Sequence, residues 1–206
     1  LFGPYAETLP NPGDYLTLTL AEEPVIVLRD RDGSIKAMSN VCRHRMSTLL
    51  EGRGHARSIV CPDHAWTYNL DGSLLAATRM PDDFEKADHG LKPVAVRVSA
   101  GAIFICLSDN PPAFDEFGDR FVEYAGPLNF ADMKLAATDI MVEKANWKLV
   151  MENNRECYHC DVGHPELISV LGTTGFGKDA PADDYLETKR ADWQALGIDH
   201  DVIEFP

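Results

Sequence analysis

Short apolar stretches that alternate with turn residues dominate the first half of the chain. Val25–Leu28 is apolar, the polar residues 31–34 follow, and apolar residues return over Ile35–Met38. Runs of this length separated by Gly, Asp, Asn or Ser are typical of β-hairpins. Two further turns are predicted on the same grounds, at residues 69–72 and 99–101. The pattern therefore predicts a small all-β sandwich.

The pattern changes after Pro111-Pro112, which interrupts any regular element. Residues 135–142 are predicted to form a strand, and Asn146 is predicted to cap a helix that runs from Trp147 to about Cys160. We therefore expect three segments with the bounds 1–14 (an N-terminal segment), 15–110 and 111–206.

Composition excludes several classes of protein. The formal net charge of −14 over 206 residues argues against a nucleic-acid partner, which requires clustered Lys and Arg. No run of about 18 apolar residues is present, so we expect no membrane span. Five cysteines do not suggest a disulfide framework, and a cytoplasmic protein that uses cysteine to bind metal is expected. Cys157 and Cys160 are interpreted as packing residues.

Two short loops each offer one thiolate and one imidazole. The first is Cys42-Arg-His44 and the second is Cys61-Pro-Asp-His64. A single Zn²⁺ would take all four side chains. A [2Fe–2S] cluster would take both thiolates at one iron and both imidazoles at the other, which raises its reduction potential above that of an all-cysteine cluster. Zinc sites usually pair cysteine with cysteine in each loop, so the mixed loops favour the cluster.

A second candidate metal site lies in the predicted helix. Glu152, Glu156 and His159 share a face if residues 147–160 are helical, and carboxylates four residues apart repel each other. Such a face is explained by a nearby cation. His164 follows Gly163, which we expect to turn the chain and bring the two imidazoles together. Two imidazoles and one carboxylate form the iron site of non-haem oxygenases, whereas the alternative is a surface helix with scattered polar residues.

Both loops resemble those of a known family. Cys42-Arg-His44-Arg and Cys61-Pro-Asp-His64-Ala-Trp-Thr-Tyr resemble the cluster loops of the Rieske non-haem iron oxygenases, alpha subunit. The segment 146–167 resembles the motif of their catalytic domain, and is particularly similar to glycine betaine and proline betaine (stachydrine) demethylases. The resemblance implies an α+β chain: an all-β Rieske [2Fe–2S] domain, then the first part of a helix-grip-like α+β catalytic domain, truncated at Pro206.

The same resemblance implies roles for individual residues. Glu156 matches the acidic residue that links the cluster of one subunit to the iron of the next, although most members have Asp there, and Asn153 is assigned with it as catalytic. The third iron ligand, a carboxylate, is expected beyond Pro206. The remaining matches are the cluster ligands Cys42, His44, Cys61 and His64, and the ligands of a mononuclear Fe(II), His159 and His164.

The function implied by the resemblance is that of the oxygenase component of a monooxygenase. Electrons from NAD(P)H would arrive through a separate flavin/iron–sulfur reductase, and O₂ would be used to hydroxylate an N-methyl group of a betaine-type quaternary ammonium compound. Demethylation would release formaldehyde, and a homotrimer is expected. The alternatives are an aromatic-ring-hydroxylating dioxygenase with an aromatic substrate, a Rieske electron-transfer protein and a zinc-binding interaction module.

Overall fold

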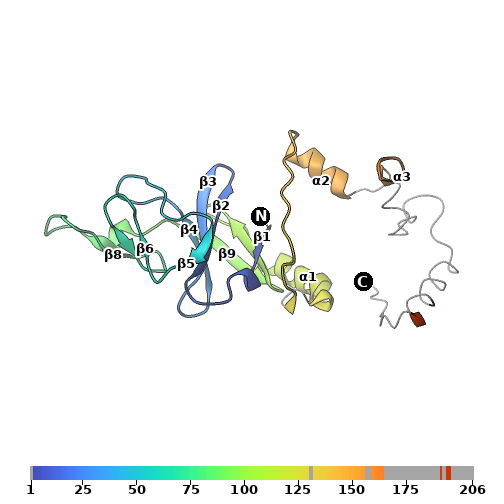
Figure 1. Ribbon diagram of the computed structural model, residues 1–206, viewed down its shortest axis with the longest axis horizontal. Coiled ribbons are helices and arrows are strands. Elements are labelled where there is room, and N and C mark those ends of the chain that lie inside the picture. Colours follow the sequence, from blue (N-terminus) through green and yellow to red (C-terminus); the bar gives the residue numbers. More distant parts are fainter. Residues whose placement is uncertain (1, 130–131, 156–158, 165–190, 192–193, 196–206) are drawn as a thin grey trace. The chain divides into compact units, whose positions relative to one another are not determined.

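The computed structural model describes residues 2–129, 132–155, 159–164, 191 and 194–195 (Figure 1). It divides into two compact units, Leu1–Ala137 and Thr138–Pro206, which are described separately below. Glu156 lies outside the described residues. The segment bounds 1–14, 15–110 and 111–206 stay predictions.

The first unit is built on two antiparallel sheets. The larger sheet has seven strands in the order β1-β10-β9-β4-β3-β2-β5, and the smaller one has three in the order β6-β7-β8. The strands of the larger sheet are β1 (Phe2–Tyr5), β2 (Asp14–Leu20), β3 (Glu23–Arg29), β4 (Ile35–Ser39), β5 (Arg53–His55), β9 (Pro93–Ser99) and β10 (Ala102–Cys106). Those of the smaller sheet are β6 (Ile59–Val60), β7 (Thr67–Tyr68) and β8 (Leu74–Ala76).

Strand β3 separates two apolar cores. Side chains alternate between the two faces of a strand, so Ile26 and Leu28 enter one core while Val25 and Val27 enter the other. The first core also contains both candidate metal-binding cysteines, Cys42 and Cys61. In Figure 1, β6 and β8 lie toward one end of this unit and β1 and α1 toward the other. The cysteines of the candidate metal loops therefore lie in the core on one face of the larger sheet. The second core lies on the other face.

The predicted hairpins are confirmed. Strands β3 and β4 pair around residues 31–34, with Ile26 opposite Met38, and β9 and β10 pair around residues 99–101. The predicted turn at 69–72 connects β7 to β8.

The predicted strand at 135–142 is wrong. These residues are exposed and form no strand, although the Leu135 backbone N–H donates to Glu7 Oε1 at 2.6 Å. An apolar run becomes a strand only when a neighbouring strand pairs with its backbone groups. Among the described residues, no strand follows β10.

Both units contain short helices. The first unit contains η1 (Ala6–Thr8), η2 (Lys86–His89), α1 (Asp115–Ala125) and η3 (Gly126–Leu128), and the second contains α2 (Trp147–Arg155) and α3 (Cys160–Gly163). Asn146 caps α2 as predicted, because its Oδ1 accepts the Lys148 backbone N–H at 3.0 Å. The described part of α2 ends at Arg155, and residues 156–158, over which the predicted helix continued, lie outside the described residues. No helix in the described part has the length and apolar character needed to cross a bilayer.

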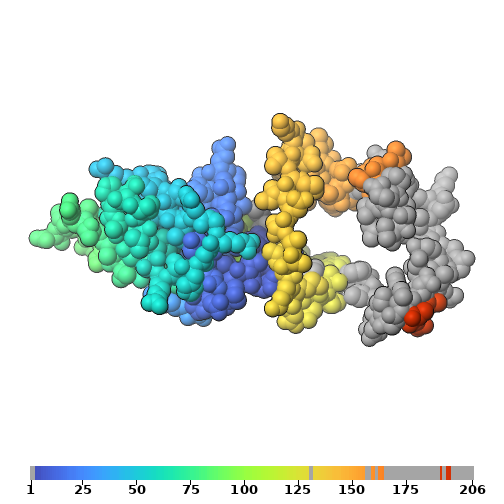
Figure 2. Space-filling view, in the orientation of Figure 1, coloured from blue at the N-terminus to red at the C-terminus, as the bar shows by residue number. Residues whose placement is uncertain are grey.

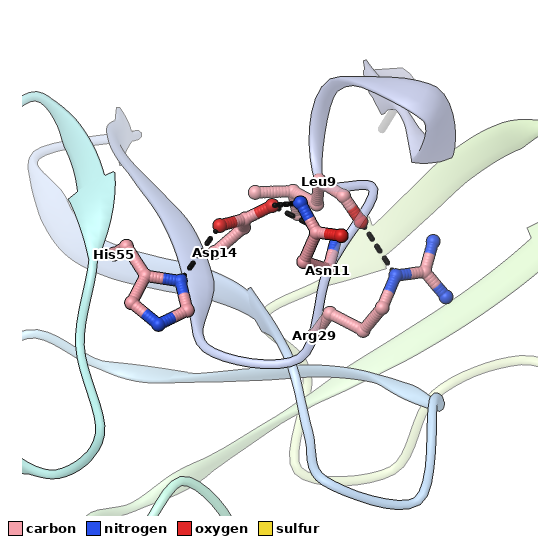
Figure 3. Close-up of polar contacts among 5 residues, drawn as sticks. All are labelled: Leu9, Asn11, Asp14, Arg29 and His55. Atoms are coloured by element: carbon pink, nitrogen blue, oxygen red, sulfur yellow. Dashed lines mark hydrogen bonds and ion pairs between the residues drawn. The ribbon is translucent and has the colours of Figure 1, made fainter.

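The N-terminal segment is fixed to the sheet by Arg29. Its guanidinium donates to three backbone carbonyls, those of Leu9 at 2.5 Å, Gly33 at 2.6 Å and Ala6 at 3.1 Å. Figure 3 shows the bond to Leu9 beside a second polar group, in which Asp14 accepts from Asn11 and pairs with His55. The Asp14–His55 contact joins β2 to the edge strand β5.

Replacing Arg29 with alanine is expected to destabilise the first unit. Arg29→Ala leaves three partly buried carbonyls without their charged donor, so the free energy of unfolding should fall by about 2 to 3 kcal/mol. Urea unfolding followed by circular dichroism measures the change. The matched control is Arg97→Ala, since exposed Arg97 donates only to its neighbour Val96 in the described structure. Equal stability of both variants would contradict the role given to Arg29.

Candidate metal centre

The first metal loop is closed by its own backbone. The Cys42 N–H donates to the Ser47 carbonyl at 2.8 Å, and the Met46 N–H donates to the Cys42 carbonyl at 3.0 Å. Buried Asn40 joins the two ends of the loop, because its side chain accepts the Leu50 N–H at 2.9 Å and donates to the Leu50 carbonyl at 2.7 Å. The loop is thus a preformed turn on the end of β4.

The second metal loop has the same hydrogen-bond pattern. The Cys61 N–H donates to the Trp66 carbonyl at 2.8 Å, and the Ala65 N–H donates to the Cys61 carbonyl at 3.0 Å. The fourth residue after each cysteine is left-handed, with φ 63° at Met46 and 58° at Ala65. Two copies of one turn therefore present the candidate ligands, although the histidine follows by two residues in the first loop and by three in the second.

The two cysteines meet inside the first core. Cys42 is fully buried and Cys61 is 3% exposed, and both are free thiols. Burial raises the pKa of the Cys61 thiol, and a hydrogen bond with Cys42 raises it further, whereas the backbone N–H of Asp63 opposes the rise. A metal binds the thiolate, so a bound cation is what would favour ionisation of this pair.

Tyr68 on β7 forms the floor of the site. Its hydroxyl oxygen lies 3.3 Å from Cys42 Sγ and accepts the Arg43 backbone N–H at 3.0 Å. Because the oxygen already accepts that bond, its own proton can be donated to the sulfur. Burial, and then the bond with Cys42, raises the pKa of the Tyr68 phenol above its usual range, so the group remains a donor.

The two histidines lie together at the rim. The rings of His44 and His64 are 4.6 Å apart in an edge-to-face arrangement. His44 is half-buried and stacks on Trp66 at 4.8 Å, while His64 is exposed. Burial lowers the pKa of His44, and the neighbouring His64 and Arg45 lower it further, so the ring is held neutral, as a metal ligand must be.

One nitrogen atom of His44 is suited to bind a metal. The Nδ1 atom of His44 is buried and has no hydrogen-bond partner in the described structure. Buried polar atoms are nearly always paired, and a metal bond would satisfy this nitrogen. In the described chain, no three His, Cys, Asp or Glu side chains converge on one ion. A [2Fe–2S] cluster requires only two protein ligands at each iron, and the two cysteines and two histidines of the loops fit this requirement.

Aromatic residues cover the inner side of His44. Trp66 is 2% exposed and contacts Phe84 at 5.5 Å and His89 at 5.8 Å between ring centroids. The His89 Nδ1 bonds to the Glu85 carbonyl at 2.9 Å, as expected for a histidine without a ligand role. Trp66 therefore fixes the plane of the His44 ring and keeps water from that side.

The second candidate site lies in the second unit. His159 and His164 are 5.7 Å apart between ring centroids, at the two ends of the single turn α3. As predicted, the chain turns here and brings the two imidazoles together, through the helical turn that ends at Gly163. Asn153 is exposed on α2. Cys160, interpreted as a packing residue, is buried.

Several residues of the first site were not foreseen from the sequence. Tyr68, Asn40 and Ser47 contact the loops through bonds that span 10 to 26 residues. Spacing within a motif cannot show such partners. The available signal was the polar character of Asn40 and Tyr68 beside apolar strands, since buried polar side chains require partners.

The left-handed residues of the two loops generate a stability prediction. A side chain at φ near 60° is strained, and glycine removes that strain. Met46 is 73% exposed, so Met46→Gly loses little packing and should raise the free energy of unfolding by about 1 kcal/mol. Chemical denaturation measures this, with Thr48→Gly as the control on the same loop. A less stable Met46→Gly variant would show that the turn is not strained.

Removing the Tyr68 hydroxyl should change the electronic properties of the site. The Tyr68 hydroxyl donates to Cys42 Sγ, and this hydrogen bond would stabilise the reduced, more negative cluster. Tyr68→Phe deletes the donor. We expect the reduction potential of the reconstituted protein to fall by about 60 mV, the one-electron equivalent of a tenfold change in equilibrium. Protein-film voltammetry measures it, with Tyr15→Phe as the control. An unchanged potential would exclude donation to the sulfur.

Two family models match this chain. The model described as Rieske [2Fe-2S] domain matches residues 4–96, and the one described as ring hydroxylating alpha subunit (catalytic domain) matches residues 130–202. The first match includes both metal loops, and the second includes both histidines of α3.

Individual proteins agree with these matches. The chain is 49% identical to a glycine betaine monooxygenase oxygenase subunit of Chromohalobacter salexigens, over 79% of this chain and 37% of the relative. It is 35% identical to a carnitine monooxygenase oxygenase subunit of Acinetobacter pittii, over 92% and 50%. The crystal structure of the quaternary ammonium Rieske monooxygenase CntA with L-carnitine matches with a TM-score of 0.75 and 34% identity, over 83% and 50%.

The chain thus spans between 37% and 50% of the length of these relatives. Its first unit has the two loops and the strands of a Rieske domain, and its second begins the catalytic domain. The resemblance stated from the loops and from the segment 146–167 is confirmed, as is the predicted fold class. The chain belongs to the Rieske non-haem iron oxygenases.

Proposed function

We propose that this chain forms part of the oxygenase component of a monooxygenase that removes an N-methyl group from a small quaternary ammonium compound. The observation that carries the proposal is the pair of matched loops, in which two buried thiols meet below two adjoining imidazoles. The likeness to glycine betaine and carnitine monooxygenase subunits supports the choice of substrate class.

Four residues would hold the [2Fe–2S] cluster: Cys42, Cys61, His44 and His64. When bound, the cluster would supply electrons one at a time to a mononuclear iron that activates O₂. The thiols lie in the apolar core, which excludes water from the sulfur side. Tyr68 donates a hydrogen bond to Cys42, and Trp66 orients His44. Exposed His64 places one edge of the site at the surface of the protein.

The mononuclear iron would be held by His159 and His164, whose rings adjoin across α3. We propose that a carboxylate from a part of the protein outside these 206 residues completes the site, since the relatives are about twice as long. Glu156 would connect the cluster of one subunit with the iron of the next, and Asn153 on α2 is proposed to act with it. For the solved CntA relative, inter-subunit electron transfer has been described.

The proposed reaction is hydroxylation of an N-methyl C–H bond by O₂, in which one oxygen atom enters the C–H bond and the other leaves as water with two electrons and two protons. The resulting carbinolamine breaks its C–N bond and gives formaldehyde and the demethylated amine. Electrons from NAD(P)H would arrive through a separate flavin/iron–sulfur reductase. A homotrimer and a cytoplasmic location stay predictions.

The alternatives are less well supported. Naphthalene 1,2-dioxygenase structures match with TM-scores of 0.55 to 0.67, below the 0.75 of CntA, while their identities of 28% to 37% are similar to the 34% of CntA. This favours quaternary ammonium chemistry over ring hydroxylation. An electron-transfer protein with the cluster alone does not explain the match of residues 130–202 to a catalytic domain. A zinc-binding module does not explain the match of residues 4–96 to the Rieske domain.

Replacing His159 tests the proposal in the complete protein. With reductase, NAD(P)H and glycine betaine, the wild type should release formaldehyde, and His159→Ala should reduce this to background because the mononuclear iron loses a ligand. The visible absorbance of the cluster and its reduction by dithionite should be unchanged. The control is His55→Ala, since His55 pairs with Asp14 on the sheet edge.

Two results would contradict the proposal. Formaldehyde release by His159→Ala at the wild-type rate would show that the reaction does not require the proposed iron site. A wild type that forms a diol from an aromatic substrate, and no formaldehyde from betaines or carnitine, would establish the dioxygenase alternative.

A further inference from the structure

One side-chain hydrogen bond joins the two metal loops directly. The Ser47 hydroxyl donates to Asp63 Oδ2, and the two residues are separated by 16 positions in the sequence. Ser47 ends the first loop, where its carbonyl accepts the Cys42 N–H. Asp63 lies in the second loop between Cys61 and His64. The bond therefore connects the part of each loop that carries the candidate ligands.

This bond lies at the rim of the site and not at its floor. Asp63 is exposed and Ser47 is half-buried, whereas the contact of Tyr68 with Cys42 is fully buried. The floor is also held by the packing of the first core. The second loop has no comparable apolar packing at the rim in the described structure, because His64 and its neighbours Pro62 and Ala65 are exposed. A polar link is therefore what restrains the loops at this level.

Asp63 is close to two candidate ligands along the chain, since it follows Cys61 by two residues and directly precedes His64. Movement of Asp63 would thus move the backbone that carries both ligands of the second loop. Its bond to Ser47 restrains that movement.

We propose that Ser47 and Asp63 are positioning residues that act as a clasp between the two loops and keep the metal cluster in place. The inference rests on the proposed function, because it takes the four residues at the loops as the cluster ligands. Neither clasp residue is a ligand itself. The clasp limits the separation of the loop tips, and so limits the access of water and chelators to the cluster.

The test is the rate at which the protein loses its cluster. The holoprotein is incubated without oxygen with an excess of EDTA, and the decay of the visible absorbance is followed. Ser47→Ala should lose the cluster roughly fivefold faster, the factor that corresponds to one lost hydrogen bond. Ser47→Thr keeps a hydroxyl and should stay within about twofold of the wild type.

A matched control separates the clasp from a general effect of losing a serine. Ser34 donates to Asp32 at 2.6 Å in the turn between β3 and β4, in the same kind of serine–aspartate bond but outside both loops. Ser34→Ala should lose its cluster at the wild-type rate. Equal loss rates for wild type, Ser34→Ala and Ser47→Ala would overturn the inference, while the coloured wild type would leave the proposed function intact.

A second variant separates the hydrogen bond from the charge. Asp63→Asn still offers an oxygen to Ser47, so its loss rate should stay near that of the wild type. Because it removes a negative charge directly beside the candidate ligand His64, the reduction potential should become more positive. Rapid cluster loss in Asp63→Asn, but not in Ser47→Ala, would contradict the clasp. A wild type that binds no iron after reconstitution would overturn the proposed function and the clasp together.

Discussion

The site depends on the burial of groups that the described protein does not fully satisfy. Two thiols lie in the apolar core, and the His44 Nδ1 is buried at its rim without a hydrogen-bond partner. Leaving that nitrogen unpaired costs free energy, and ionising the two buried thiols without a cation would cost more. A metal cluster meets that need at both kinds of atom, since it binds thiolate and neutral imidazole. The residues of the site are thus suited to bind a group that the polypeptide does not supply.

The rest of the first unit holds these groups in place. The left-handed residues Met46 and Ala65 allow each loop to return its backbone to the cysteine that began it. Asn40 closes the base of the first loop, and Trp66 supports the ring of His44. Strand β3 lies between the core that contains the two cysteines and the second core. The sheet that carries the site is therefore stabilised by packing on its other face as well. The same turn used twice gives a site with one thiolate and one imidazole from each loop.

The sequence was sufficient for the features that depend on short-range patterns. The hairpins around residues 31–34 and 99–101 follow from apolar runs between turn residues, and the cap at Asn146 follows from its amide side chain. The loops were found because cysteine and histidine are rare and their spacing is short. By contrast, Tyr68 is a partner of Cys42 across 26 positions, and no local pattern shows such a contact.

The incorrect strand prediction has a physical cause. Residues 135–142 have the apolar character of a strand, but strands need neighbours, and the described chain provides none there. His159 and His164 were correctly expected to adjoin, because the helical turn α3 between them depends only on local hydrogen bonds. A single sequence shows such local turns, but it does not show pairing with a distant strand.

The central claim is that two thiolates and two imidazoles from the matched loops bind two irons in unequal environments. Mössbauer spectroscopy of the protein reconstituted with ⁵⁷Fe tests this most directly, because it reports the ligands of each iron separately. The account predicts two iron sites of equal population, one with the parameters of an all-sulfur environment and one shifted by nitrogen ligands. A spectrum with a single type of iron site, or a protein that takes up zinc in place of iron, would contradict it.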